Sequence, residues 1–127
     1  MEQAKVLLVD DEEEFVSTLA ERLRLRGLHA ETAYNGEEAL QVIAATPPDV
    51  VVLDVLMPGM SGLAVLRRIK TEYPHIPVIL LTGMGTTRDG VEGLRLGALD
   101  YLVKPLKIEE LIEKLDEALE KASGGVT

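Results

Sequence analysis

Three aspartates are the residues of this sequence whose types and positions best suggest chemistry. Asp54 directly follows the apolar run Val50–Leu53, and Asp10 and Asp11 directly follow Val6–Val9. Clustered carboxylates supply the oxygen ligands that hard cations such as Mg²⁺ prefer, and an aspartate can also act as a nucleophile that forms an acyl phosphate. The simpler alternative is that these acids only end strands or favour a helix N-terminus. The rest of the chain decides between the two interpretations.

A threonine and a lysine occupy equivalent places. Thr82 follows the run Ile76–Leu81, and Lys104 follows Leu99–Val103. A threonine hydroxyl can hydrogen-bond a phosphoryl oxygen, and a lysine is a compact cation that can neutralise one or pair with Asp54. One polar residue at the end of one strand is commonplace. Because four such runs end in groups of complementary chemistry, we expect these side chains to form one small site.

The elements that must position these residues follow from the pattern of apolar residues. Continuous Val and Leu runs are typical of strands buried on both faces of a parallel sheet. Five runs alternate with five helical patterns, which predicts an α/β fold with a doubly wound, five-stranded parallel sheet and helices on both faces. The flavodoxin-like strand order 2-1-3-4-5 would bring the five side chains to one edge. The predicted strands are Lys5–Val9, His29–Tyr34, Asp49–Asp54, Ile76–Leu81 and Leu99–Val103.

Local signals mark one end of each of the first three helices, and periodicity predicts the last helix. Asn35 and Ser61 are placed to cap the second and third helices, with Glu38 at the capping-box position of the second. Gly27 is placed to end the first helix, and an amphipathic pattern predicts a last helix over Ile108–Lys121.

The fourth helix is the least regular. Thr86 and Asp89 have the spacing of a capping box, but Gly90 and Gly93 fall inside the helix, where each costs about 1 kcal/mol relative to alanine. We therefore predict a weakly held helix. Its inner face is predicted from its apolar residues, Val91, Leu94 and Leu96.

Composition narrows the functional classes. The 127 residues predict one domain over residues 1–122 with a frayed tail at 123–127. The net charge of −9 argues against direct nucleic-acid binding and permits cations or a basic protein partner. No apolar run approaches the roughly 18 residues of a membrane span. The absence of cysteine excludes disulfides and thiolate metal sites, and favours the cytoplasm.

In combination, these motifs resemble the receiver domain of two-component response regulators in its single-domain form. The resemblance extends from Lys5 to about Lys121 and rests on the acidic pair, Asp54 ahead of Met57-Pro58-Gly59, Thr82 and Lys104-Pro105. It implies that Asp54 accepts a phosphoryl group from a histidine kinase or a histidine phosphotransfer protein, and that the domain then changes its surface for a downstream protein. It also supports the flavodoxin-like strand order.

The resemblance implies a metal site as well. Asp11, Asp54 and the backbone carbonyl of Leu56 would bind Mg²⁺ or Mn²⁺, and Asp10 would act through a coordinated water. The domain would be no enzyme in the ordinary sense, since it would catalyse only its own phosphorylation and dephosphorylation.

Four further residues have roles implied by the resemblance. Thr82 would hydrogen-bond the phosphoryl group and Lys104 would pair with it. The peptide bond between Lys104 and Pro105 would be cis. Tyr101 would be the switch aromatic that turns inward together with Thr82. The last helix lacks the arginine that some dimerising relatives use, which favours a monomer.

One residue departs from the usual receiver pattern, and two others occupy positions that affect dephosphorylation in the family. Gly83 replaces the usual alanine after Thr82, which would loosen that loop. Leu56 and Met84 occupy the two positions that tend to tune dephosphorylation, and both are apolar. Because neither can hydrogen-bond an attacking water, we expect a long-lived phosphoryl group.

Three alternatives remain at this point. A Mg²⁺-dependent phosphatase or phosphotransferase commonly needs a second acid close to the nucleophile and a substrate cap, but residues 55 and 56 are Val and Leu and the chain has no room for a cap. A degenerate receiver that serves only as a binding module would be expected to lack part of the acid, threonine and lysine set. A flavodoxin is disfavoured, because the first strand ends in acids rather than in a phosphate-binding loop.

Overall fold

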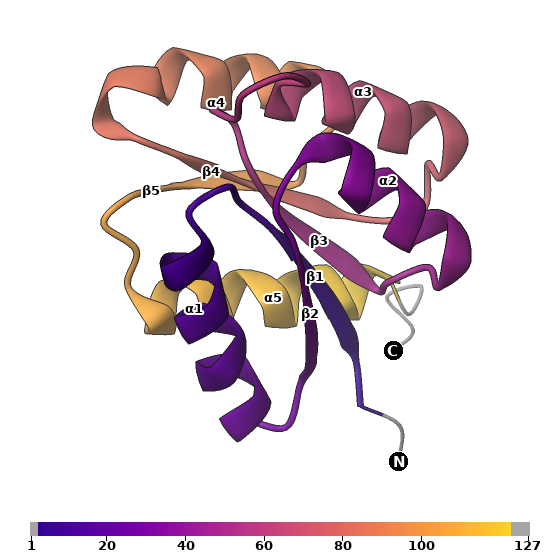
Figure 1. The fold of residues 1–127 in the computed structure, drawn as a ribbon, viewed down its shortest axis with the longest axis vertical. Helices are drawn as coiled ribbons and strands as arrows, with labels where there is room; N and C mark the ends of the chain where they lie inside the picture. The colour runs from indigo at the N-terminus through magenta and orange to yellow at the C-terminus, as the bar shows by residue number, and fades with distance from the viewer. Residues whose placement is uncertain (1–2, 123–127) are drawn as a thin grey trace.

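A computed structural model describes residues 3–122 of the chain, and it confirms the predicted fold class. The five strands are all parallel and lie in the order β2-β1-β3-β4-β5 (Figure 1). The strands lie in the order in which they follow one another in the chain, except that β2 lies at the edge and β1 is therefore next to β3. The strands are β1 (Lys5–Val9), β2 (His29–Ala33), β3 (Val50–Asp54), β4 (Val78–Thr82) and β5 (Asp100–Val103).

Helices cover both faces of the sheet. Figure 1 shows α1 and α5 on one side, and α2, α3 and α4 on the other. A short 3₁₀ helix, η1, precedes α4. The bounds are α1 (Glu13–Leu25), α2 (Gly36–Ala45), α3 (Gly62–Glu72), η1 (Met84–Thr86), α4 (Thr87–Arg95) and α5 (Ile108–Ala122).

Two apolar clusters, one on each face of the sheet, form the core. Side chains alternate between the faces of a strand, so Leu7 and Leu53 pack under α2 and α3 while Leu8 and Val52 pack under α1 and α5. All of them are buried. This double burial is the reason that the central strands are uninterrupted apolar runs rather than alternating patterns.

Two of the predicted helix caps are present. The Asn35 side chain accepts a hydrogen bond from the Glu38 backbone N–H at 2.8 Å, and the Ser61 hydroxyl accepts one from the Ala64 N–H at 3.2 Å. The Glu38 carboxylate accepts from the N–H of Tyr34 at 3.1 Å, one residue before the capping-box donor. These local signals therefore predicted both helix starts.

Strand boundaries differ from the predicted ones by one or two residues. The fourth strand begins at Val78 rather than Ile76, because the Ile76 N–H bonds back to the Tyr73 carbonyl in a turn and Pro77 has no N–H to donate. The second strand ends at Ala33. The predicted tail, residues 123–127, lies outside the described residues.

The inner face of α4 is the main correction to the sequence-based expectation. Val91 and Leu94 are 51% and 40% exposed, and the buried residues of the helix are Gly90 and Gly93. Of the three predicted residues, Leu96, at the C-cap, is the one that packs against the core. A side chain at Gly90 would collide with the Tyr101 ring, and one at Gly93 with Leu80. The two glycines therefore form the contact face, because they let the helix backbone approach the sheet closely.

The capping box predicted at Thr86 is also wrong. The Thr86 side chain makes no cap for α4. Its hydroxyl accepts a hydrogen bond from the Gly83 N–H at 2.8 Å and donates to the Gly83 carbonyl at 3.1 Å, which closes the 3₁₀ turn of η1. The hydroxyl is thus used one turn earlier than the spacing suggested.

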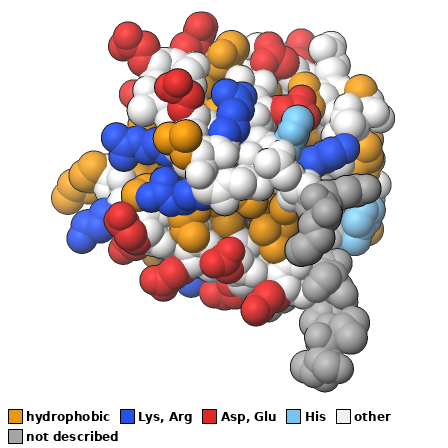
Figure 2. Space-filling view, turned by 90° about the horizontal axis from the view of Figure 1, so that it is seen from below, with side chains coloured by type: hydrophobic (Ala, Val, Ile, Leu, Met, Phe, Trp, Pro, Cys, Tyr) orange, Lys and Arg blue, Asp and Glu red, His pale blue; other side chains and the backbone are white. Residues whose placement is uncertain are grey.

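The face of the molecule seen from below the view of Figure 1 carries acidic, basic and apolar side chains. Acidic side chains lie along the upper and lower borders of that face, with basic and apolar ones between them (Figure 2). Among residues 3–122, none of the helices is both long and apolar enough to cross a bilayer.

Candidate functional site

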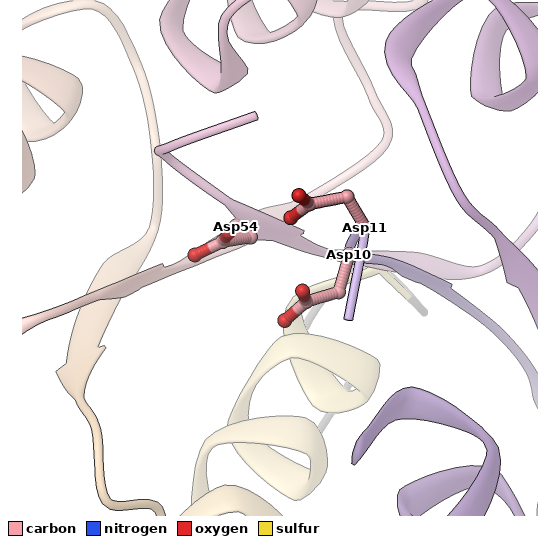
Figure 3. Close-up of side chains that lie close together, drawn as sticks. All are labelled: Asp10, Asp11 and Asp54. Atoms are coloured by element: carbon pink, nitrogen blue, oxygen red, sulfur yellow. The ribbon is translucent and has the colours of Figure 1, made fainter. Parts of the chain in front are cut away.

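The ends of β1 and β3 bring two aspartates together. The strands pair in parallel with Val9 opposite Leu53, so Asp10 and Asp54 follow as neighbours at the carboxyl edge of the sheet. The Asp10 N–H donates to the Ala33 carbonyl at 3.1 Å and continues the pairing with β2. Figure 3 shows the carboxylates of Asp10, Asp11 and Asp54 turned to the same side. One oxygen of each lies within 4.8 Å of the others.

The three acids differ in burial. Asp10 is 1% exposed and Asp54 is 6% exposed, whereas Asp11 reaches the surface. Burial raises the pKa of Asp54 from its usual 3.8 to about 7, and the negative charge of Asp10 adds to the rise. The charge of Lys104 works in the opposite direction without cancelling it. The charge of Lys104 is therefore not enough to stabilise the ionised form of Asp54 at this buried position. The oxygen donors of the three carboxylates fit a small divalent cation.

Lys104 supplies the positive charge at this edge. Its Nζ lies 2.8 Å from Asp10 Oδ2 and 3.7 Å from Asp54 Oδ1. Burial alone lowers the pKa of Lys104, but hydrogen bonds to Asp10 and Glu12 outweigh it and raise that pKa above its ordinary value. The ammonium is thus charged, and it hydrogen-bonds Asp10 rather than Asp54.

The backbone around Lys104 is fixed by β4 and β5. The Lys104 N–H donates to the Thr82 carbonyl at 2.7 Å, one step past the pairing of Thr82 with Val103. The peptide bond between Lys104 and Pro105 is cis. The sheet therefore places Lys104 and Thr82 side by side at its carboxyl edge.

Thr82 lies next to Asp54, and Tyr101 lies on β5, the strand beyond β4. Thr82 is fully buried at the end of β4, next to Asp54 on β3, since Leu81 pairs with Asp54. Its hydroxyl is 3.5 Å from the Leu102 carbonyl, at the long limit of a hydrogen bond. Tyr101 is half-buried and packs against the cluster under α4. The weakly bound hydroxyl can reorient towards a stronger partner.

Close backbone packing holds the loop that follows Asp54. The Gly62 N–H donates to the Val55 carbonyl at 2.9 Å, and a side chain at Gly62 would collide with the backbone of Asp54. The start of α3 therefore lies directly against the end of β3. The side chain of Leu56, in this loop, is exposed, and so is that of Met84, which follows β4.

Two residues that contact Lys104 were not among the predicted ones. Glu12 Oε1 lies 2.7 Å from Lys104 Nζ, and the ammonium is 4.6 Å from the centroid of the Phe15 ring. Acids that follow Asp11 at the start of a helix are favourable there in any case, through the helix dipole. Nothing local distinguishes Glu12 from Glu13 and Glu14, because its partner lies 92 residues away in the chain.

Comparison with protein families gives one match over most of the chain. The family described as the response regulator receiver domain matches residues 6–116. Its description is the same as the one that the motifs suggested.

Two curated bacterial proteins illustrate the sequence similarity. The chain is 42% identical over 119 residues to YkoG of Bacillus subtilis, described as an uncharacterized transcriptional regulatory protein, and 38% identical over 119 residues to the transcriptional regulatory protein TrcR of Mycobacterium tuberculosis. Each alignment covers 94% of this chain, but 52% and 46% of the relative. The chain thus spans about half the length of these relatives.

Solved structures agree with the sequence comparison. A response regulator receiver domain protein from Clostridium thermocellum superposes with a TM-score of 0.92 at 32% identity, covering 97% of this chain and 99% of the other. The receiver domain of NtrX from Brucella abortus gives a TM-score of 0.87 at 36% identity, covering 91% and 98%.

Proposed function

The chain belongs to the response regulator receiver domain family, and from this membership we propose that Asp54 is its phosphoacceptor. One observation carries the proposal. The carboxylate of Asp54 lies at the carboxyl edge of the sheet with two further carboxylates within 4.8 Å and the ammonium of Lys104 at 3.7 Å. A nucleophile beside a metal-binding set and a cation is the arrangement that phosphoryl transfer requires.

The reaction we propose is a single displacement at phosphorus. A carboxylate oxygen of Asp54 attacks the phosphorus of a phosphohistidine, the P–N bond breaks, and the imidazole leaves with the bonding electron pair. Lys104 and the hydroxyl of Thr82 then face the negative oxygens of the new acyl phosphate. The donor is a histidine kinase or a histidine phosphotransfer protein, as the family membership suggests.

A divalent cation belongs to the proposed reaction. Asp10, Asp11, Asp54 and the backbone carbonyl of Leu56 would hold Mg²⁺ or Mn²⁺, with Asp10 acting through a water. When bound, the ion would neutralise charge on the transferring phosphoryl group. The raised pKa of Asp54 supports this, since burial and, after it, the negative charges of neighbouring acids disfavour an ionised carboxylate that lacks a cation.

The output we propose is a change of surface that a downstream protein reads. By analogy with other phosphorylated residues, the modification adds about −1.5 to −2 charges. Thr82 would turn towards the phosphoryl group and Tyr101 would follow it inward, which couples the site to α4 and β5. With its net charge of −9, this domain is proposed to act as a cytoplasmic monomer on protein partners, without direct contact with nucleic acid or membrane.

Intact-mass spectrometry tests the proposal. The protein is incubated with acetyl phosphate, with and without Mg²⁺, as wild type, as Asp54→Asn and as Asp49→Asn. Asp49 is a matched control because it is an exposed aspartate at the opposite end of the same strand, where it accepts a hydrogen bond from the Lys5 N–H. We expect Mg²⁺-dependent gain of one phosphoryl group in wild type and Asp49→Asn only. A gain in Asp54→Asn, or none in wild type, would contradict the proposal.

A further inference from the structure

We propose that Glu12 is a positioning residue that holds Lys104 before phosphorylation and must release it when Asp54 is phosphorylated. The inference rests on the proposed function and extends it. Glu12 slows phosphorylation because it holds the lysine that the reaction needs.

The contacts of the Lys104 ammonium lead to this inference. Nζ lies 2.7 Å from Glu12 Oε1 and 2.8 Å from Asp10 Oδ2, both hydrogen-bond distances. It lies 3.7 Å from Asp54 Oδ1, which is too far for a hydrogen bond. A lysine ammonium has three N–H donors. Two of the three are therefore committed to residues other than the proposed phosphoacceptor.

The Glu12 contact is built by the turn between β1 and α1. The Glu12 N–H donates to Asp10 Oδ1 at 2.9 Å, so Glu12 and Asp10 are held next to each other and both face Lys104. The ring of Phe15, one turn into α1, lies 4.6 Å from the ammonium and adds a cation–π contact. The start of α1 thus forms a cradle for Lys104, made of Glu12 and Phe15.

The two carboxylate partners of Lys104 differ in how readily they can be replaced. The Asp10 side chain is 1% exposed, and losing its cation there would leave a buried charge uncompensated. The Glu12 side chain is 63% exposed, so water can solvate its carboxylate as soon as the lysine leaves. Glu12 is therefore the partner that Lys104 exchanges for a phosphoryl oxygen.

This exchange predicts a specific kinetic effect. Before phosphorylation, removing the Glu12 carboxylate frees one donor of Lys104 and speeds the reaction. In the phosphorylated protein, Lys104 has already left Glu12, so the same change leaves the rate of phosphoryl loss unaltered. An exposed ion pair accounts for about a two- to fivefold change in a rate constant.

The experiment compares Glu12→Gln with Glu13→Gln. Both variants remove one exposed carboxylate from the start of α1, and Glu12 makes no side-chain cap that its substitution would remove. The rate constant for phosphorylation is measured with acetyl phosphate and Mg²⁺, where the P–O bond breaks and acetate leaves, and decay is followed after removal of the donor. We expect Glu12→Gln to react about two- to fivefold faster than Glu13→Gln and to decay at the same rate.

A second readout reports the contact directly. The side-chain NMR signal of the Lys104 Cε group in the unphosphorylated protein should shift in Glu12→Gln and Glu12→Ala, and stay in place in Glu13→Gln. Equal phosphorylation rates in the Glu12 and Glu13 variants, or an unshifted Lys104 signal, would overturn the inference while the proposed function stands. Failure of wild type to accept a phosphoryl group would instead overturn the proposed function, and the Lys104 signal would still test the contact.

Discussion

The ring of Tyr101 in β5 lies directly on the backbone of Gly90 in α4. A Cβ atom at residue 90 would be 2.7 Å from Cγ and Cδ2 of the ring, a distance that real side chains do not adopt. The helix can therefore lie this close to β5 only while residue 90 lacks a side chain. The position of Tyr101 and the position of α4 are mutually dependent, which matters if Tyr101 moves during signalling.

We expect Gly90→Ala to lower the stability of the protein. Alanine in place of glycine would by itself stabilise a helix interior by about 1 kcal/mol, but overpacking against the ring costs about 1–3 kcal/mol. The net expectation is a loss of up to about 2 kcal/mol in the free energy of unfolding. Urea denaturation of wild type and variant measures it.

The same substitution in a Tyr101→Ala background provides the control. With the ring removed, Gly90→Ala should stabilise by about 1 kcal/mol, because only the helix propensity remains. If Gly90→Ala has the same effect in both backgrounds, the contact between residue 90 and the ring does not limit the approach of α4.

The pKa of Asp54 predicts how stability depends on pH in the absence of metal. The folded protein holds the proton of Asp54 up to about pH 7, whereas the unfolded chain releases it near 3.8. Between these values the folded state binds more protons, so its stability falls as the pH rises. The advantage of Asp54→Asn over wild type should grow from about pH 4 to about pH 7 and level off above. Urea unfolding at several pH values measures it, and an advantage that is constant with pH would show that Asp54 titrates normally.

Mg²⁺ should stabilise the folded protein through the three aspartates. Binding to the native state alone adds about 1.4 kcal/mol at ten times the dissociation constant, from RT ln(1 + [L]/Kd). Asp11→Asn removes one exposed ligand and should lose most of the effect, while Glu13→Gln should keep it. The urea midpoint with and without Mg²⁺ distinguishes the variants. An equal gain in Asp11→Asn would place the ion elsewhere.

The exposed apolar side chain of Leu56 should prolong the life of the phosphoryl group. Leu56→Asn places an amide where it can hydrogen-bond an attacking water, and one such bond in the transition state is equivalent to about a two- to tenfold faster decay. Leu56→Met, which stays apolar, is the control. Decay is followed by intact mass after removal of the donor. Loss of phosphate from wild type within seconds would contradict the expectation of a long lifetime.

Local patterns in the sequence predicted most of the framework. Runs of Val and Leu predicted strands buried on both faces, and Asn35 and Ser61 predicted two helix starts. These signals act within a few residues, so they do not depend on how the elements pack. The sequence also indicated that Asp10, Asp54 and Lys104 would meet, because each follows a parallel strand and such strands end at one edge.

The tertiary structure decided what these residues contact. The apolar pattern predicted an inner face of Val91, Leu94 and Leu96, of which Leu96 packs against the core. Contacts with Tyr101 and Leu80 give the rest of that face to Gly90 and Gly93. The spacing of apolar residues could not predict this inner face, because it depends on how closely a helix approaches a strand.

The environment of the site depends on the same kind of information. The sequence by itself determined, to within one or two residues, where the strands end, since apolar runs, chain breaks and caps are properties of neighbouring residues. The raised pKa of Asp54 and the hydrogen bond between Glu12 and Lys104 follow from burial and from side chains 92 residues apart. Both depend on distances through space, which only the packed chain defines.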